Sequence, residues 1–108
     1  MILEVAPLRI LADRSQEFEA AFAQAERLIA SMPGCLSHEL QHCLEQTDLY
    51  LLLVRWKTLA DHEEGFRKST QYQAWKALLH HFYDPFPTVL HFEAVAGPRV
   101  VREGLPAA

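Results

Sequence analysis

Glycine and basic residues are both scarce in this chain. Only four of its 108 residues are glycine, and its formal net charge is -4. Phosphate- and dinucleotide-binding loops need closely spaced glycines, because their backbone N–H groups must approach the phosphates. A protein that binds a phosphate backbone needs a basic surface. The sequence therefore predicts neither a nucleotide-binding loop nor nucleic acid as a partner.

Long apolar runs and a secretory signal are also missing. No apolar stretch approaches the roughly 20 residues that a membrane-spanning helix requires, so we expect no membrane association. The first ten residues, MILEVAPLRI, lack the basic start and the small-residue cleavage site of a secretory signal. We expect a cytoplasmic protein that begins with a strand.

The two cysteines and six histidines give no pattern of a disulfide or a metal site. Cys35 and Cys43 are eight residues apart in one predicted strand, or about 26 Å, whereas a disulfide needs Cα atoms within about 7 Å. They are expected to be reduced. His38 and His42 are about 13 Å apart along the same strand, too far to share a metal with bonds near 2.1 Å. No CxxC or HxH pair is present, and no metal site is predicted.

Hydrophobic periodicity predicts an α+β fold with the order βαββαβ, an antiparallel ferredoxin-like sheet with helices on one face. Asp13-Arg14-Ser15-Gln16 resembles a capping box, and the apolar residues after it repeat at helical spacing as far as Met32. Strict alternation from 35 to 45 predicts a strand with Leu36, His38, Leu40, His42 and Leu44 on one face. The predicted strands span 2–11, 35–45, 49–57 and 88–96, and helices are expected at 18–32, from Thr58, and at 71–82. Residues 97–108 form a polar tail, an arm or a disordered segment, outside a domain of residues 1–96.

The strand over 49–57 is apolar on both faces, with Tyr50 and Trp56 on one and Leu51 and Leu53 on the other. Helices in a chain this short cover only one face of a four-strand sheet. The second face is therefore predicted to bind a ligand or another subunit. Pro7 indicates that the first strand is bulged or partly at an edge.

Most of the aromatic residues lie between residues 50 and 95. His62 and Phe66 are four residues apart and share one helix face, and an aromatic stripe continues through Tyr72, Trp75 and Phe82. Thr58 is a candidate N-cap, followed by Asp61 in the first turn. The rings line either a core or a pocket.

These residues resemble the antibiotic biosynthesis monooxygenase family through the Pro33-Gly34 turn, the order of elements and the string W-x5-H-x3-F-x2-S-x2-Y-x2-W. The resemblance implies a dimeric α/β barrel, in which two ferredoxin-like domains pair through their open sheet faces and each holds one pocket. It implies oxygenation of a small quinol or phenol with O2, without flavin or metal. The alternative is a non-catalytic dimeric domain of the same fold that binds a ligand or a partner.

The haem-degrading branch of that family is disfavoured. Its members use an Asn on the first strand, a Trp on the helix and a downstream His that binds iron. Here the first strand has no Asn, the Trp position holds Phe66, and the His position falls near Lys76. His80 or His81 as a displaced ligand is the remaining haem-binding alternative.

His62 is the candidate catalytic base, because an imidazole with a pKa near 6.5 can be tuned by burial to the operating pH. A histidine that only orients a neighbour or bonds a carbonyl is the other interpretation. The oxygenase hypothesis requires His62 to line a closed, partly polar cavity.

Four further residues are candidates for binding the substrate, namely Trp56, Phe66, Tyr72 and Trp75. The first three form apolar walls for a flat ligand or are plain core, and Trp75 fits the core better. Arg55 is a fifth candidate, either as a stabiliser of a phenolate oxygen or in an ion pair across a dimer interface. Arg67 is expected to be a solvated helix charge.

Overall fold

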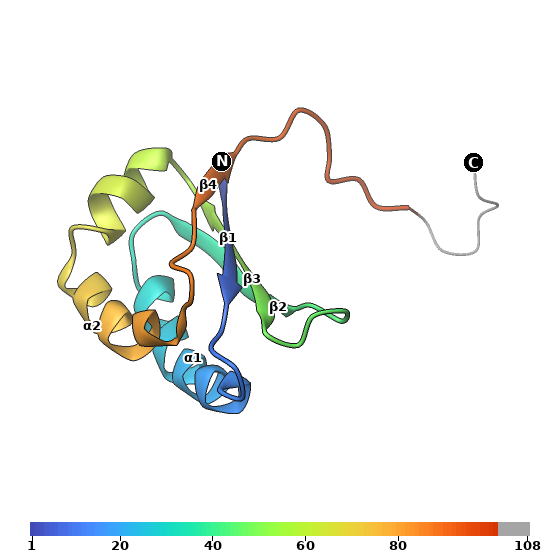
Figure 1. Cartoon of the computed structure of the whole chain (residues 1–108). Coiled ribbons are helices and arrows are strands. Elements are labelled where there is room, and N and C mark those ends of the chain that lie inside the picture. Colours follow the sequence, from blue (N-terminus) through green and yellow to red (C-terminus); the bar gives the residue numbers. More distant parts are fainter. Residues whose placement is uncertain (102–108) are drawn as a thin grey trace.

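Four antiparallel strands form one sheet, and the helices cover one of its faces (Figure 1). The structure, a computed structural model, describes residues 1–101. The strands are β1 (Ile2–Arg9), β2 (Cys35–His42), β3 (Leu49–Trp56) and β4 (Leu90–Phe92), in the sheet order β2-β3-β1-β4. The helices are α1 (Ser15–Ala30), a π-helix (Asp61–Phe66), α2 (Thr70–Leu79) and a 3₁₀ turn (His80–Phe82). The predicted ferredoxin-like α+β fold is confirmed.

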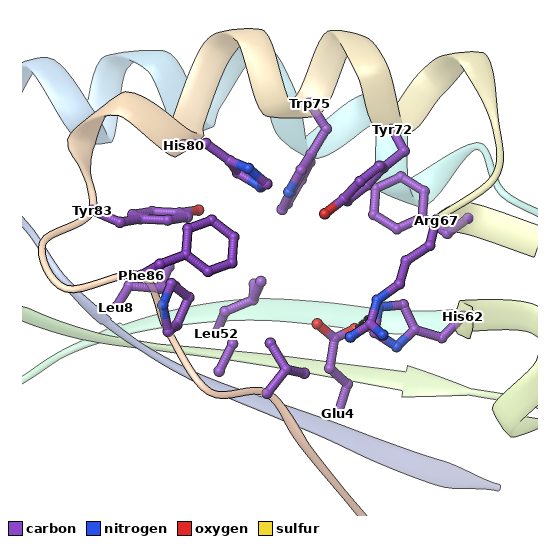
Figure 2. Close-up of a pocket in the computed structure, with 14 residues that line it drawn as sticks. Glu4, Leu8, Leu52, His62, Arg67, Tyr72, Trp75, His80, Tyr83 and Phe86 are labelled. Atoms are coloured by element: carbon purple, nitrogen blue, oxygen red, sulfur yellow. Dashed lines mark ion pairs between the residues drawn. The ribbon is translucent and has the colours of Figure 1, made fainter. Parts of the chain in front are cut away.

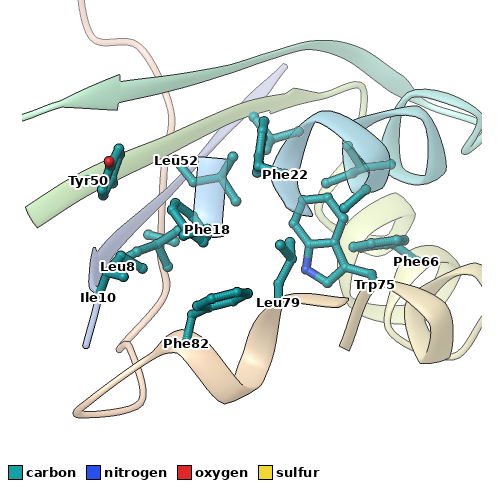
Figure 3. Packing of buried hydrophobic residues seen from close by; sticks show 14 of the residues in the cluster. Leu8, Ile10, Phe18, Phe22, Tyr50, Leu52, Phe66, Trp75, Leu79 and Phe82 are labelled. Carbon is teal, nitrogen blue, oxygen red and sulfur yellow. The ribbon is translucent and has the colours of Figure 1, made fainter. Parts of the chain in front are cut away.

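The hydrophobic core lies between the covered face of the sheet and the two α-helices (Figure 3). The predicted helical period of α1 is confirmed, because Phe18, Phe22 and Ile29 are all buried. The rings of Phe18 and Tyr50 meet edge to face with centroids 5.0 Å apart. Each such apolar side chain contributes about 1.5–3 kcal/mol by leaving water, so α1 is fixed on the sheet mainly by this row.

The start of α1 differs from the predicted capping box. The N-cap position is Arg14, and no side chain there accepts a capping hydrogen bond. Asp13 adopts a left-handed backbone conformation with φ 62°. The Ser15 hydroxyl donates instead to the carbonyl of Thr47 at 3.3 Å. Ser15 therefore connects the start of α1 to the turn before β3.

The alternation of β2 holds only in its central part. The register with β3 shifts between Cys35 and Ser37, so Leu36 lies in a bulge and is exposed. The strand ends at His42, and Leu44 beyond it is 92% exposed. The prediction that Leu36 and Leu44 continue one strand face was therefore wrong, because a bulge at one end and a turn at the other break the two-residue repeat.

The last strand is shorter than the predicted 88–96. Its three residues pair with Leu3–Val5, whereas the other end of β1 is occupied by the chain after α2. Asp84 N–H donates to the Arg9 carbonyl, and Leu11 N–H donates to that of Phe82, both at 2.9 Å. Residues 85–89 therefore leave β1 between the Asp84–Arg9 hydrogen bond and the pairing of β4 with Leu3–Val5. At Pro7 β1 pairs with β3 alone among the described residues, as expected for a strand partly at an edge.

The sheet face opposite the helices is apolar and only partly covered in the single chain. Leu49, Leu51 and Leu53 of β3 are half-buried there, and Leu90 and Phe92 of β4 are 55% and 50% exposed. This pattern agrees with the expectation that a second face of the sheet is left for a ligand or a subunit.

The chain after β4 runs away from the sheet without regular secondary structure as far as residue 101 (Figure 1). The remainder of the predicted 97–108 tail lies outside the described residues. Within residues 1–101, no helix is long and apolar enough to cross a membrane.

Candidate active site

A cavity of about 400 Å³ lies between α2 and the covered face of β1 and β3 (Figure 2). Its floor is formed by alternate residues of β1, namely Glu4, Ala6 and Leu8, and by Leu52 of β3. The other walls come from the π-helix, from α2 and from the segment that leaves β1. Those residues are His62, Phe66, Arg67, Tyr72, Trp75, His80, Tyr83, Phe86, Pro87 and Val89. Its volume falls within the range of small-molecule sites.

Glu4 is the buried acid of this cavity, and the sequence analysis did not identify it. The residue is 5% exposed. Its Oε1 accepts a hydrogen bond from Trp56 Nε1 at 2.9 Å and lies 3.3 Å from His62 Nε2. Figure 2 shows the carboxyl group directed into the cavity. No described residue donates a hydrogen bond to the other oxygen, Oε2, which is left for a ligand.

The environment of Glu4 favours its protonated form more than water does. Burial raises the pKa of the carboxyl above its ordinary value of 4.5, while the Trp56 hydrogen bond and the Arg67 charge oppose the rise. A carboxyl of this kind takes up a proton closer to neutral pH than a surface glutamate does. It has the properties of a general base, and of the corresponding acid once protonated.

His62 lines the cavity and is 3% exposed. Its ring stacks on Trp56 with centroids 5.3 Å apart, and its Nδ1 lies 2.7 Å from Nε2 of His91 on β4. Burial, followed by the charges of Arg67 and His91, lowers the pKa of His62 to about 3.

A neutral imidazole with so low a pKa is a weak proton acceptor at neutral pH. The lowered pKa disfavours His62 as a base poised near the operating pH, because burial suppresses the charge that the imidazole would carry after taking up a proton. Its place between Glu4 and His91 fits the second interpretation, that of an orienting hydrogen-bond group.

The helical segment that carries His62 begins at Leu59, directly after Thr58, as the sequence predicts. Thr58 Oγ1 accepts from Asp61 N–H at 3.2 Å, and the Asp61 carboxylate accepts from Thr58 N–H at 3.1 Å, which makes a reciprocal cap. Gly34 passes directly beside this cap with φ 84°, and a Cβ there would lie 2.2 Å from Asp61 Oδ2. The Pro33-Gly34 turn thus fixes the start of the helix. π-helical turns are rare and are often found at functional sites.

Three of the predicted substrate-binding residues, Phe66, Tyr72 and Trp75, line the cavity. The ring of Phe66 meets those of Tyr72 and Trp75 edge to face, at 5.2 and 5.6 Å. Trp75 is 4% exposed and also belongs to the hydrophobic core, so its ring is part of both the core and the cavity wall. These rings form the apolar wall that a flat aromatic ligand needs.

Trp56 and Arg55 do not line the cavity. Trp56 is completely buried behind the Glu4 carboxyl and holds it by a hydrogen bond. Arg55 points to the open sheet face, where Nη1 lies 3.4 Å from Glu39 Oε1 of the same chain. Arg55 therefore does not reach this cavity, because adjacent strand residues point to opposite faces.

Arg67 supplies positive charge at the cavity, contrary to the expectation of a solvated helix charge. Its side chain is 37% exposed and lies 3.9 Å from Glu63. Its charge opposes protonation of Glu4, His62 and His91. A ligand oxygen that becomes negative beside Glu4 would lie within its field.

The far end of the cavity carries His80 and Tyr83. Burial lowers the pKa of His80 and raises that of Tyr83, so both are neutral at pH 7.

His81, the other alternative iron ligand, is exposed and is not part of the cavity wall. Within residues 1–101, no group of three or more His, Cys, Asp and Glu is arranged to hold a metal ion. Cys35 and Cys43 are free thiols.

Comparison with known proteins gives the family. Residues 1–78 match the model of the antibiotic biosynthesis monooxygenase family, described as ABM. The chain belongs to the antibiotic biosynthesis monooxygenase family. The chain is also similar to the uncharacterized protein YczJ of Bacillus subtilis (strain 168). The two are 57% identical over 95 residues, which are 88% of this chain and all of YczJ.

Solved structures agree with this assignment. A protein of Bordetella bronchiseptica, assigned by name to the antibiotic biosynthesis monooxygenases, is 33% identical with a TM-score of 0.84, over 88% of this chain and 97% of that one. SnoaB of Streptomyces nogalater, a cofactor-independent oxygenase, shares the fold with a TM-score of 0.77 at 17% identity, over 89% and 94% of the two chains. In this ABM protein the residues of the Trp56–Trp75 string hold Glu4 and form one wall of the cavity.

Proposed function

We propose that this ABM protein oxygenates a small phenol or quinol with O2 and needs neither flavin nor metal. The observation that carries the proposal is Glu4, a buried carboxyl with one oxygen open to a cavity walled by aromatic rings. A flat electron-rich ring fits between Phe66 and the floor of the sheet. Its hydroxyl would lie against Glu4 Oε2, within the field of Arg67.

The chemistry begins with a proton transfer from the ring hydroxyl to the Glu4 carboxylate. The resulting phenolate is stabilised by the positive charge of Arg67 beside the cavity. The phenolate passes electrons to O2, and carbon–oxygen bond formation at the ring gives a peroxide that takes up a proton from Glu4. Loss of water leaves a carbonyl. For a naphthol the balance is C10H8O + O2 → C10H6O2 + H2O, so the substrate itself supplies all four electrons.

The relatives support the oxygenase proposal to different degrees. SnoaB is named as a cofactor-independent oxygenase, which makes this chemistry available to the fold. Fold similarity alone does not establish activity. The proposal therefore depends on the position and environment of Glu4, and a domain that binds an aromatic ligand without turnover is the competing function.

We further propose that two chains pair through their open sheet faces. The leucines of β3, together with Leu90 and Phe92, would be covered in such a dimer. Apolar side chains on one contiguous sheet face favour association. Sedimentation at micromolar concentration should give the mass of two chains, and a monomer mass would contradict the pairing.

The test of the activity is oxygen uptake by the metal-stripped protein with a panel of naphthols and naphthohydroquinones, with autoxidation subtracted. Glu4→Gln keeps the size of the side chain and removes the base, so kcat should fall by about 10²–10⁴-fold. Glu45→Gln, at an exposed glutamate, is the matched control and should behave as the wild type. Saturable binding of the panel without uptake above autoxidation would favour the ligand-binding domain instead.

A further inference from the structure

His62 uses both of its ring nitrogens inside the protein. Nε2 lies 3.3 Å from Glu4 Oε1, and Nδ1 lies 2.7 Å from His91 Nε2. Glu4 and His91 are register partners of β1 and β4, so their side chains share the covered face of the sheet. His91 is partly exposed and lies on an edge strand. The three side chains form one row from the cavity to the surface.

A ligand in the cavity would cut Glu4 off from water. Oε1 is already held by Trp56 and His62, and Oε2 is the oxygen that the ligand covers. The Trp56 indole can only donate its N–H and cannot pass a proton on. A neutral imidazole can, because it takes up a proton at one nitrogen and releases one from the other.

We propose that His62 and His91 form a proton path between Glu4 and solvent. The proposal rests on the proposed function of Glu4 as the acid–base group of the cavity. In the outward direction Glu4 gives its proton to His62 Nε2, His62 gives the proton on Nδ1 to His91 Nε2, and His91 releases the proton on Nδ1 to water. In the inward direction each transfer reverses.

Both rings are neutral before a proton enters the path and after it has left, and only their tautomers differ between these two states. When Glu4 is a carboxylate, each histidine carries its proton on Nε2. When Glu4 is protonated and about to release, each carries it on Nδ1. The charged groups that act on the pair are Arg67, which opposes charge on both rings, and Glu63, which favours charge on His91. Burial lowers the pKa of both rings, which agrees with a neutral path.

The path predicts that the tautomers of His62 and His91 follow the protonation of Glu4. In protein labelled with ¹⁵N-histidine, both rings should switch from Nε2–H to Nδ1–H as pH falls through the pKa of Glu4. In Glu4→Gln the switch should be lost. Tautomers that stay fixed while Glu4 titrates, or a doubly protonated His62 at neutral pH, would overturn the path. This measurement needs no substrate, so it decides the proposal even if no oxygenation is found.

Variants at His91 distinguish a proton path through this residue from a purely structural role in holding His62. His91→Gln can still donate an amide N–H to His62 but cannot relay a proton. Turnover starts from the Glu4 carboxylate, so a ligand-bound protein with protonated Glu4 must first release that proton through the path. On any substrate that is turned over, kcat should therefore fall by about tenfold to hundredfold with KM unchanged, and added imidazole should restore His91→Ala. His81→Gln is the control, at an exposed histidine outside the cavity. Full activity of His91→Gln would overturn the path, whereas absence of uptake by the wild type would overturn only the proposed function.

Discussion

Replacing His62 by glutamine is expected to make the protein less sensitive to acid. Folded His62 has a pKa of about 3, against 6.5 for an ordinary histidine. Unfolding releases it into water, where it takes up a proton below pH 6.5. The folded state therefore binds fewer protons than the unfolded state between these two values. Stability from this source is complete above pH 6.5 and is lost as pH falls toward 3.

The size of the effect follows from the shift. Each pKa unit corresponds to about 1.4 kcal/mol, so the full shift amounts to roughly 4–5 kcal/mol and the part lost at pH 4.5 to about 3 kcal/mol. The side chain of His62 is 4% exposed, so screening by solvent reduces these values little. Glutamine at this position does not titrate and can still donate a hydrogen bond toward Glu4.

Urea unfolding at pH 7 and pH 4.5 measures the difference. The wild type should lose about 3 kcal/mol more than His62→Gln between the two pH values. Glu4 acts in the opposite direction, because its raised pKa makes the folded carboxyl bind more protons than the unfolded one. The comparison is therefore repeated in Glu4→Gln, which removes this contribution. If the free energy of unfolding falls by the same amount between the two pH values with and without His62, both with Glu4 present and in Glu4→Gln, the buried, neutral state of His62 is refuted.

Three further predictions concern stability and assembly. Gly34→Ala should destabilise the protein by about 2 kcal/mol or more in urea unfolding, because it combines an unfavourable φ with a clash against Asp61; an unchanged midpoint would contradict that contact. Ser69→Ala should cost about 1 kcal/mol, because the Ser69 hydroxyl caps α2 by accepting from Tyr72 N–H at 3.1 Å, and Ser69→Asp should retain most of the stability. Leu51→Lys should convert a sedimenting dimer to a monomer without loss of the fold by circular dichroism, and an unchanged mass would place any interface elsewhere.

Local periodicity was sufficient for much of the fold. The two-residue repeat of β3 correctly separated Tyr50 and Trp56 from the leucines of the open face. The four-residue spacing of His62 and Phe66 correctly gave them one buried face. The cap at Thr58 was also predicted, since both of its partners are within three residues of each other. In each case the contacts that decide the structure are local in sequence.

The errors arose where distant segments compete for the same groups. The expected box at Asp13 failed because Ser15 bonds to Thr47, 32 residues away. The last strand is shorter than predicted because Phe92 lies opposite Leu3, so residues 95 and 96 extend past the start of β1 and have no partner there. Such long-range partners leave no periodic signal in the sequence.

Glu4 was overlooked for a similar reason. It is the single acid of a strand whose other charged residue is Arg9, at a position that alternation would place on the same face as Ala6 and Leu8. Its partner Trp56 is 52 residues away. The register pairs Glu4 with Val54, and Trp56 is the diagonal neighbour on the same face. The lone acid was visible as a signal, but its meaning depended on a strand register that the sequence does not specify.

The proposed function depends on Glu4 as a buried acid–base group inside the cavity. The most direct test is a ¹³C NMR titration of the Glu4 carboxyl in protein labelled with ¹³C-glutamate, assigned with Glu4→Gln. The account predicts a midpoint clearly above the ordinary value of 4.5, and a further shift when a naphthol occupies the cavity. A midpoint at or below 4.5, unchanged by the naphthol, would contradict it.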